Sequence, residues 1–90
     1  MDFGEALKEL KDGNRVAREG WNGKDMFIYL SKGKKIEHED LVPGLEEILP
    51  EKDVYKINPR IDMKAADGSI VIGWLASQTD MLAEDWVVVE

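Results

Sequence analysis

Apolar residues near the start of the chain recur with the period of a helix. Their spacing of three or four positions places them on one helix face. Asp2 and Glu5 are spaced as a capping box, and Gly13 suits the position that ends a helix. The sequence therefore predicts an amphipathic helix at the N-terminus. The residues of its apolar face are Phe3, Ala6, Leu7 and Leu10.

Three later segments have the short, apolar or alternating pattern of strands. Residues 15–18 predict a short strand, and residues 86–89 predict the last one. Residues 26–30 are apolar or aromatic at every position, so both faces of that strand are apolar. This pattern indicates a central strand, or one whose second face contacts a partner or a ligand.

Residues 54–64 form an extended stretch that is interrupted at Asn58-Pro59, which predicts an edge position or a bulge. Residues 65–69 carry a strong hairpin signal with Asp67-Gly68 at its tip. Residues 70–74 alternate again and predict a strand. Residues 77–83 predict a short helix, with the Ser77 side chain accepting a hydrogen bond from the backbone N–H near Asp80.

The stretch from 32 to 53 differs from the rest of the chain. Half of its positions are charged, and no aromatic residue occurs between Tyr29 and Tyr55. Apolar residues with helical spacing predict a short helix that starts near Pro43 and ends at Pro50. We expect residues 32–53 to form a charged excursion from the main sheet in which changes of length are tolerated.

These elements predict one α+β domain over residues 1–90. It comprises an N-terminal helix packed on a strongly bent antiparallel sheet of about five strands, and a short C-terminal helix. The connections are short, which favours antiparallel pairing. A chain of 90 residues has only a modest core of its own, and oligomerisation is one way to increase the buried area.

The net charge of −7 argues against binding to a DNA or RNA polymer, because such binding depends on neutralising many phosphates. A small nucleotide needs only one or two cations, so it is not excluded. No Lys or Arg follows Lys64. A phosphate beside the C-terminal segment must therefore be bound by cations from earlier in the chain, by a partner subunit or by backbone N–H groups.

Location in the cell is also constrained by composition. No apolar run approaches 18 residues, so we expect no membrane span. Met1 leads directly into an acidic amphipathic stretch, which does not resemble a signal peptide. The chain has no cysteine, which removes disulfides and thiolate metal sites and fits a reducing cytosol.

The sequence contains no recognisable catalytic apparatus, so we expect no enzyme activity, no metal and no cofactor. His38 is the single histidine and lies among charged residues, which predicts a solvated surface position. The serines lack a nucleophile motif, and no glycine-rich phosphate loop is present. Helix-end capping and solvation account for the carboxylates at Asp80, Glu84 and Asp85.

Residues 74–86 place two tryptophans around a compact polar cluster, without Lys, Arg, Gly or Pro. One interpretation is a capped helix whose apolar residues fill the core. The other is a ligand site, in which aromatic rings stack on a base and polar side chains bind its edges and the ribose. The candidate residues are Trp21, Asn22, Trp74, Ser77 and Gln78 for base and ribose, and Arg18, Lys24 and Arg60 for phosphate.

The segments FGEALKELKDGNRVAREGWNGK and WLASQTDMLAEDW resemble a small phage and prophage domain family, the second class of Thoeris anti-defence proteins. The resemblance implies a molecular sponge in the cytoplasm of an infected bacterium. Such a sponge binds a cyclic nucleotide immune signal, glycocyclic ADP-ribose made by a TIR-domain enzyme, and holds it without cleavage. It also implies a homotetramer with ligand pockets between subunits.

Three alternatives remain open at the level of the sequence. The ligand could be a cyclic di- or trinucleotide of another defence system. The domain could be a structural or protein-interaction module of phage assemblies, in which the aromatic faces contact protein. An enzyme that cleaves the signal is the third, and it lacks the metal or activated water that hydrolysis requires.

Overall fold

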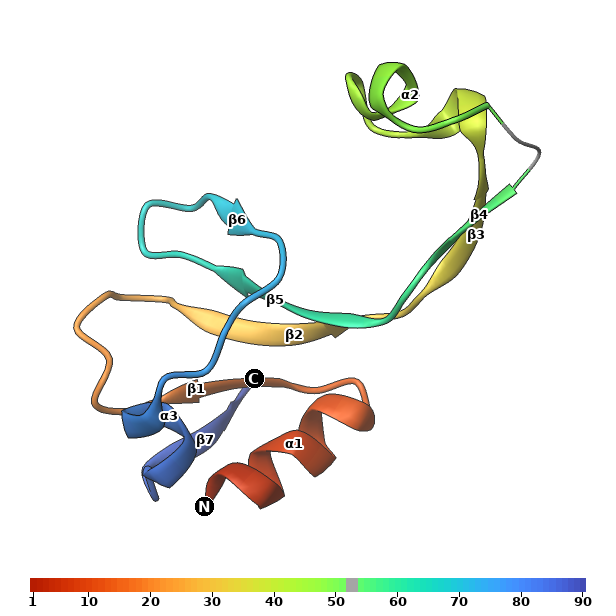
Figure 1. Ribbon diagram of the computed structural model, residues 1–90. Coiled ribbons are helices and arrows are strands. Elements are labelled where there is room, and N and C mark those ends of the chain that lie inside the picture. Colours follow the sequence, from red (N-terminus) through yellow and green to blue (C-terminus); the bar gives the residue numbers. More distant parts are fainter. Residues whose placement is uncertain (52–53) are drawn as a thin grey trace.

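A computed structural model describes residues 1–51 and 54–90 of the chain. It confirms the predicted α+β fold, with helix α1 (Phe3–Lys11) on an antiparallel sheet of five strands and the short helix α3 (Gln78–Leu82) near the C-terminus (Figure 1). The strand order is β6-β5-β2-β1-β7. The strands are β1 (Arg15–Arg18), β2 (Phe27–Ser31), β5 (Arg60–Lys64), β6 (Ile70–Val71) and β7 (Trp86–Val89).

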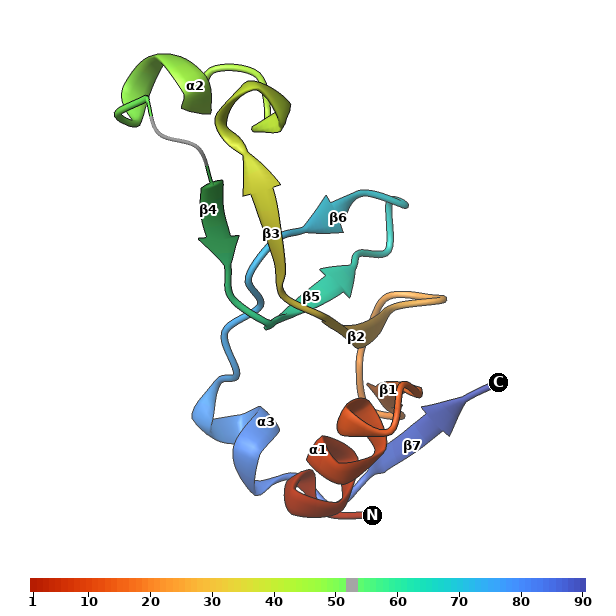
Figure 2. The ribbon, with the colours of Figure 1, turned by 90° about the vertical axis from the view of Figure 1, so that its right-hand side faces the viewer.

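Helix α1 begins at the predicted capping box. The Asp2 carboxylate accepts a hydrogen bond from the Glu5 backbone N–H at 2.8 Å, and the Glu5 carboxylate accepts one from the Asp2 N–H at 3.1 Å. The apolar face of α1 packs on β1, β2 and β7, as Figure 2 also shows for β1 and β7. The fully buried cluster at this contact consists of Ala6, Leu10, Val16, Ile28 and Trp86.

Strands β2 and β5 continue beyond the main sheet as a second, smaller ribbon. Here β3 (Lys34–Glu37) pairs with β4 (Val54–Ile57) in a separate two-stranded sheet. The short helices η1 (His38–Asp40) and α2 (Leu45–Ile48) lie at its far end. We call residues 34–51 and 54–57 the arm; positions 52 and 53 lie outside the described residues.

The arm projects away from the rest of the domain (Figures 1 and 2). The molecule measures 45 × 26 × 25 Å, and its radius of gyration is 15.6 Å. A compact domain of this length would have a radius of gyration of about 12 Å. The arm therefore adds length to the molecule without adding to the core beneath α1.

The arm bends away from the main sheet where Gly33 faces Pro59. A β-carbon at position 33 would overlap the backbone carbonyl oxygen of Ile57 and lie 2.9 Å from Cδ of Pro59. Pro59 lies between β4 and β5, where one ladder ends and the next begins. The interruption predicted at Asn58-Pro59 is thus the junction between the two sheets, and only glycine fits opposite it.

Two predicted elements are shorter in the structure. The strand expected over residues 70–74 ends at Val71, because Gly73 has a φ of +82° and its N–H donates to the Asp62 side chain at 2.9 Å. The helix expected between Pro43 and Pro50 is the four-residue α2, and its apolar side chains are exposed. None of the helices in residues 1–51 and 54–90 is long and apolar enough to cross a membrane.

Candidate ligand-binding site

Three tryptophans and a phenylalanine form one cluster between α1, β7 and the loops that precede β2 and α3. Trp86 is completely buried at its centre. Its ring centroid is 5.4 Å from those of Phe3 and Trp21 and 6.2 Å from that of Trp74, in tilted or edge-to-face arrangements. Trp21 and Trp74 are half-buried, with centroids 6.4 Å apart. The cluster is therefore core at Trp86 and partly open to solvent at Trp21 and Trp74.

Arg18, which was predicted to bind phosphate, is held by two carboxylates. Its Nη1 donates to Oδ1 of Asp80 at 2.9 Å and its Nε to Oδ1 of Asp85 at 2.8 Å. These hydrogen bonds, the one to Asp85 first, raise the pKa of Arg18, and the bond that Arg18 donates lowers the pKa of Asp85. The guanidinium charge is thus already neutralised within the chain. A phosphate contact by Arg18 stays a prediction, and it would require competition with both acids.

Asp80 links the ion pair to the tryptophans. Its Oδ1 also accepts a hydrogen bond from Nε1 of Trp21 at 3.3 Å, and its backbone carbonyl accepts one from Nε1 of Trp86 at 3.0 Å. Burial acts to raise the pKa of Asp80, but hydrogen bonds from Arg18, Ser77 and Trp21 outweigh it and lower the pKa. Asp80 therefore helps to orient the half-buried Trp21 and Arg18 through its carboxylate and the buried Trp86 through its backbone carbonyl.

Asp80 also forms the predicted cap of α3. The Ser77 hydroxyl accepts a hydrogen bond from the Asp80 N–H at 3.0 Å, and the Asp80 carboxylate accepts one from the Ser77 N–H at 3.2 Å. The capping role expected for Asp80 is confirmed. The ion pairs of Asp80 and Asp85 with Arg18 were missed, because they join residues more than 60 positions apart.

A second carboxylate, Asp62 in β5, was not anticipated from the sequence. Its side chain is 1% exposed and accepts hydrogen bonds from the Ser31 hydroxyl at 2.6 Å, the Gly73 N–H at 2.9 Å and Nε of Arg60 at 3.1 Å. Asp62 thereby fixes the turn that precedes Trp74. The sequence signal that could have revealed Asp62 is an acidic residue between apolar neighbours in a predicted strand. A charge buried at such a position needs several hydrogen-bond partners.

The structure assembles part of the predicted site. Arg18 and Trp21 are joined through Asp80, Trp74 contacts Trp21, and α3 starts beside them. Arg60 is connected to this region through Asp62 and Gly73. The remaining predicted residues are exposed, Asn22 and Lys24 in the connection between β1 and β2 and Ser77 and Gln78 at the start of α3.

Exposed apolar side chains border the cluster. They lie on the segment that follows β6 and on α3. In a single copy of the chain these side chains contact mainly solvent, so they suit an additional apolar partner such as a ligand or a second subunit. The most exposed are Leu75 at 89%, Leu82 at 79% and Ile72 at 63%.

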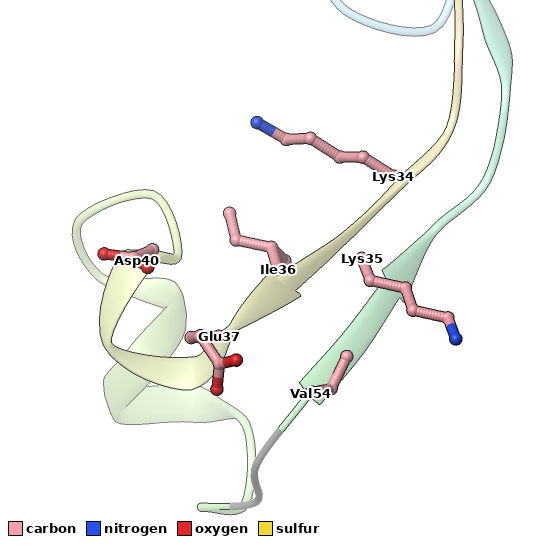
Figure 3. Close-up of a pocket in the computed structure, with 6 residues that line it drawn as sticks. All are labelled: Lys34, Lys35, Ile36, Glu37, Asp40 and Val54. Atoms are coloured by element: carbon pink, nitrogen blue, oxygen red, sulfur yellow. The ribbon is translucent and has the colours of Figure 1, made fainter.

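Two hollows lie on the arm. The larger, of about 590 Å³, is lined by residues of β3, η1 and β4 (Figure 3). The other, of about 360 Å³, lies at the bend and is lined by Gly33, Lys34, Lys35, Lys56, Ile57 and Pro59. Within residues 1–51 and 54–90, no group of three or more His, Asp or Glu side chains is placed to hold a metal ion.

The fold and the cluster define a class of protein: a small α+β domain with half-buried tryptophans held in place by an arginine–carboxylate network. The family model for the Tad2-like, or Thoeris anti-defense 2-like, domain matches residues 1–89. The chain is also 45% identical over 89 residues to "Thoeris anti-defense 2" of Bacillus phage SP01, covering 99% of this chain and 94% of that protein. The chain therefore belongs to the Thoeris anti-defense 2-like family, which confirms the resemblance seen in the sequence.

Proposed function

We propose that this protein is a phage or prophage sponge for a cyclic nucleotide immune signal. It binds glycocyclic ADP-ribose in the cytoplasm of the infected host and holds it without cleavage, so that the downstream effector is not activated. Membership in an anti-defence family supports the biological role. The observation that carries the ligand class is the pair of half-buried tryptophans, Trp21 and Trp74, beside the polar start of α3.

The chemistry of this pair suits a nucleotide. Each ring packs on Trp86 at one edge and keeps part of its surface accessible. Stacking of a base on an aromatic side chain contributes about 1–3 kcal/mol per base. Ser77 and Gln78 are exposed next to the rings and can bind ribose hydroxyls and base edges. We assign phosphate binding to Lys24 and Arg60. Arg18 is a third candidate, although its phosphate contact competes with the two carboxylates that it already binds.

Sequestration is stoichiometric, so the affinity must be high. A nanomolar Kd corresponds to about −12 kcal/mol. A pocket that binds so tightly encloses most of its ligand. The tryptophan cluster of a single copy is partly open, and Leu75 and Leu82 beside it are exposed. We therefore propose that a neighbouring subunit closes each pocket, in the homotetramer that the resemblance to the family implies.

The test is isothermal calorimetry with 1″–3′ glycocyclic ADP-ribose, followed by heat denaturation and chromatography of the released ligand. We expect tight binding and recovery of intact ligand. Trp21→Ala should reduce the affinity at least about tenfold, the equivalent of one lost stacking contact. Phe27→Leu is the matched control, because Phe27 is also half-buried but lies in β2, outside the tryptophan cluster.

Each other outcome has a definite meaning. Cleaved ligand would identify an enzyme and overturn the sponge. Absence of heat would direct the search to cyclic di- and trinucleotides, and competition between ligand classes would show whether they share a site. If no nucleotide binds or raises the Tm, the domain is a protein-interaction module.

A further inference from the structure

Charge on the arm is segregated along its length. Lysines occupy the base, next to the bend, with Lys34 and Lys35 in β3 and Lys56 in β4. Acids occupy the tip, including Glu46 and Glu47 in α2. The other acids of the tip among the described residues are Glu37, Glu39, Asp40 and Glu51. The arm therefore has a positive end and a negative end.

The lysines at the base form no ion pair with any other residue that the structure describes. Lys35 and Lys56 are directly opposite each other in the β3–β4 ladder, an arrangement of like charges that destabilises a sheet. Figure 3 shows Lys35 on one side of the ribbon and Lys34 with Ile36 on the other. The ion pairs among the described residues involve Arg18 and Arg60, and none involves these lysines. An external carboxylate would relieve this repulsion.

A hollow is available there for such a carboxylate. The cavity of about 360 Å³ at the bend is bordered by Lys34, Lys35 and Lys56, and none of its lining residues is acidic. This is unusual in a chain with a net charge of −7. Its remaining lining, which includes Ile57 and Pro59, is apolar and suits the aliphatic part of a glutamate.

The tip of the arm has internal polar contacts but displays apolar surface. Tyr55 donates a hydrogen bond to the Pro50 carbonyl, and Nε2 of His38 lies 3.3 Å from the Leu49 carbonyl oxygen. These contacts make His38 half-buried rather than fully solvated as predicted. Four large apolar side chains remain exposed here, namely Val42 at 66%, Leu45 at 39%, Ile48 at 75% and Val54 at 38%.

We propose that the arm pairs with the arm of a second copy, antiparallel, so that the lysine base of each contacts the acidic tip of the other. A two-fold axis repeats the same contact twice, which is the usual geometry of a homodimer. Charge complementarity selects the direction of pairing, and the exposed apolar residues of the tip supply buried area. The inference deepens the proposed function, because it rests on the protein's being an oligomer, but it does not depend on the identity of the ligand.

The test uses two charge-reversal variants and their mixture in sedimentation velocity experiments. In Lys35→Glu/Lys56→Glu both ends of the arm are negative. In Glu39→Lys/Asp40→Lys/Glu46→Lys/Glu47→Lys four of the six described acids of the tip are reversed, so both ends are positive. The assembly formed by each variant alone should dissociate at a protein concentration at least about tenfold higher than the wild-type assembly does. An equimolar mixture should reassociate, because every base then faces a tip of opposite charge. Raising the salt concentration should weaken the wild-type assembly.

Lys8→Glu/Lys11→Glu on α1 is the control, because it changes the net charge as much as the first variant does but lies away from the arm. It should leave sedimentation unchanged. The proposal is overturned if neither arm variant alters the assembly, if their mixture does not restore it, or if the wild type is monomeric. Calorimetry with glycocyclic ADP-ribose on the same samples separates a failed ligand assignment from a failed interface. An arm that binds another macromolecule would leave the assembly of both arm variants the same as that of the wild type.

Discussion

Arg18 and Asp80 are 62 positions apart in the sequence, yet Nη1 of one lies 2.9 Å from Oδ1 of the other. Both side chains are largely shielded from solvent. The pair joins β1 to α3, and through Asp80 it orients the indole of Trp21. A residue that looks like a phosphate ligand in the sequence is therefore first a structural residue, which positions the aromatic rings of the candidate site.

Asp80→Asn should lower the Tm by several degrees. The amide keeps the shape of the side chain but loses the charge that Arg18 binds, and the pair's partial exposure limits the loss. Tryptophan fluorescence should shift to the red, because the neutral amide is a weaker acceptor for the hydrogen bond that Trp21 donates. Glu84→Gln is the control, since this exposed neighbour has no side-chain partner among the described residues. Equal Tm values for the two variants would show that the pair does not stabilise the fold.

Stability should fall in acid, with Asp62 as one cause. Burial acts to raise the pKa of Asp62, but hydrogen bonds from Ser31 and Gly73 and the nearby Arg60 outweigh it, so the pKa lies below its usual 3.8. A carboxylate whose pKa is lower in the folded state stabilises the fold above its unfolded pKa. That stabilisation is lost as the pH falls through the folded pKa.

The free energy of unfolding should thus be nearly constant from pH 7 to about 5 and decrease below about 4. Urea denaturation at a series of pH values measures it. Asp62→Asn should be less stable at pH 7, by about 1–3 kcal/mol, because buried donors lose a charged acceptor. Its stability should also depend less on pH. A variant with the wild-type pH profile would exclude Asp62 as a source of acid sensitivity.

Local patterns in the sequence predicted the elements whose causes are local. The capping box at Asp2, the N-cap at Ser77 and the Trp86–Val89 strand all have the predicted positions. The end of β6 was not predictable in this way, since it depends on a hydrogen bond between Gly73 and Asp62, eleven positions apart. The partners of Arg18 were missed for the same reason. Long-range polar contacts leave no periodic trace in a single sequence.

Trp86 and Trp74 should respond differently to replacement by phenylalanine. Trp86→Phe leaves a cavity in the core and removes the hydrogen bond from Nε1 to the Asp80 carbonyl, so a loss of about 1–3 kcal/mol is expected. Trp74 is half-buried and its Nε1 has no partner among the described residues, so Trp74→Phe should cost less than about 1 kcal/mol. Its main effect should be on ligand affinity.

Chemical denaturation and calorimetry on the same two variants distinguish core from site. Trp74→Phe should retain the urea midpoint and bind glycocyclic ADP-ribose more weakly, since a smaller ring stacks over less area. A large loss of stability in Trp74→Phe would instead assign this ring to the core. The interpretation of residues 74–86 as a capped helix that fills the core would then explain this segment without a ligand site.

Gly33→Ala tests the bend on which the arm depends. A β-carbon at position 33 would overlap the Ile57 carbonyl and lie 2.9 Å from Pro59 Cδ, so the junction between the two sheets must open. Overpacking of this kind costs about 1–3 kcal/mol. Gly4→Ala is the matched control, because the nearest atom to its new β-carbon is 3.4 Å away and alanine favours the helix.

The two alanine variants should therefore differ in sign as well as in size. Gly4→Ala should raise the free energy of unfolding, by up to about 1 kcal/mol, and leave sedimentation unchanged. Gly33→Ala should lower it and, because the arm no longer leaves the sheet at its native angle, should also weaken self-association. If Gly33→Ala lost stability but assembled normally, the angle of the arm would be irrelevant to the oligomer. An interface elsewhere on the domain, such as the exposed Leu75 and Leu82, would then have to hold the subunits together.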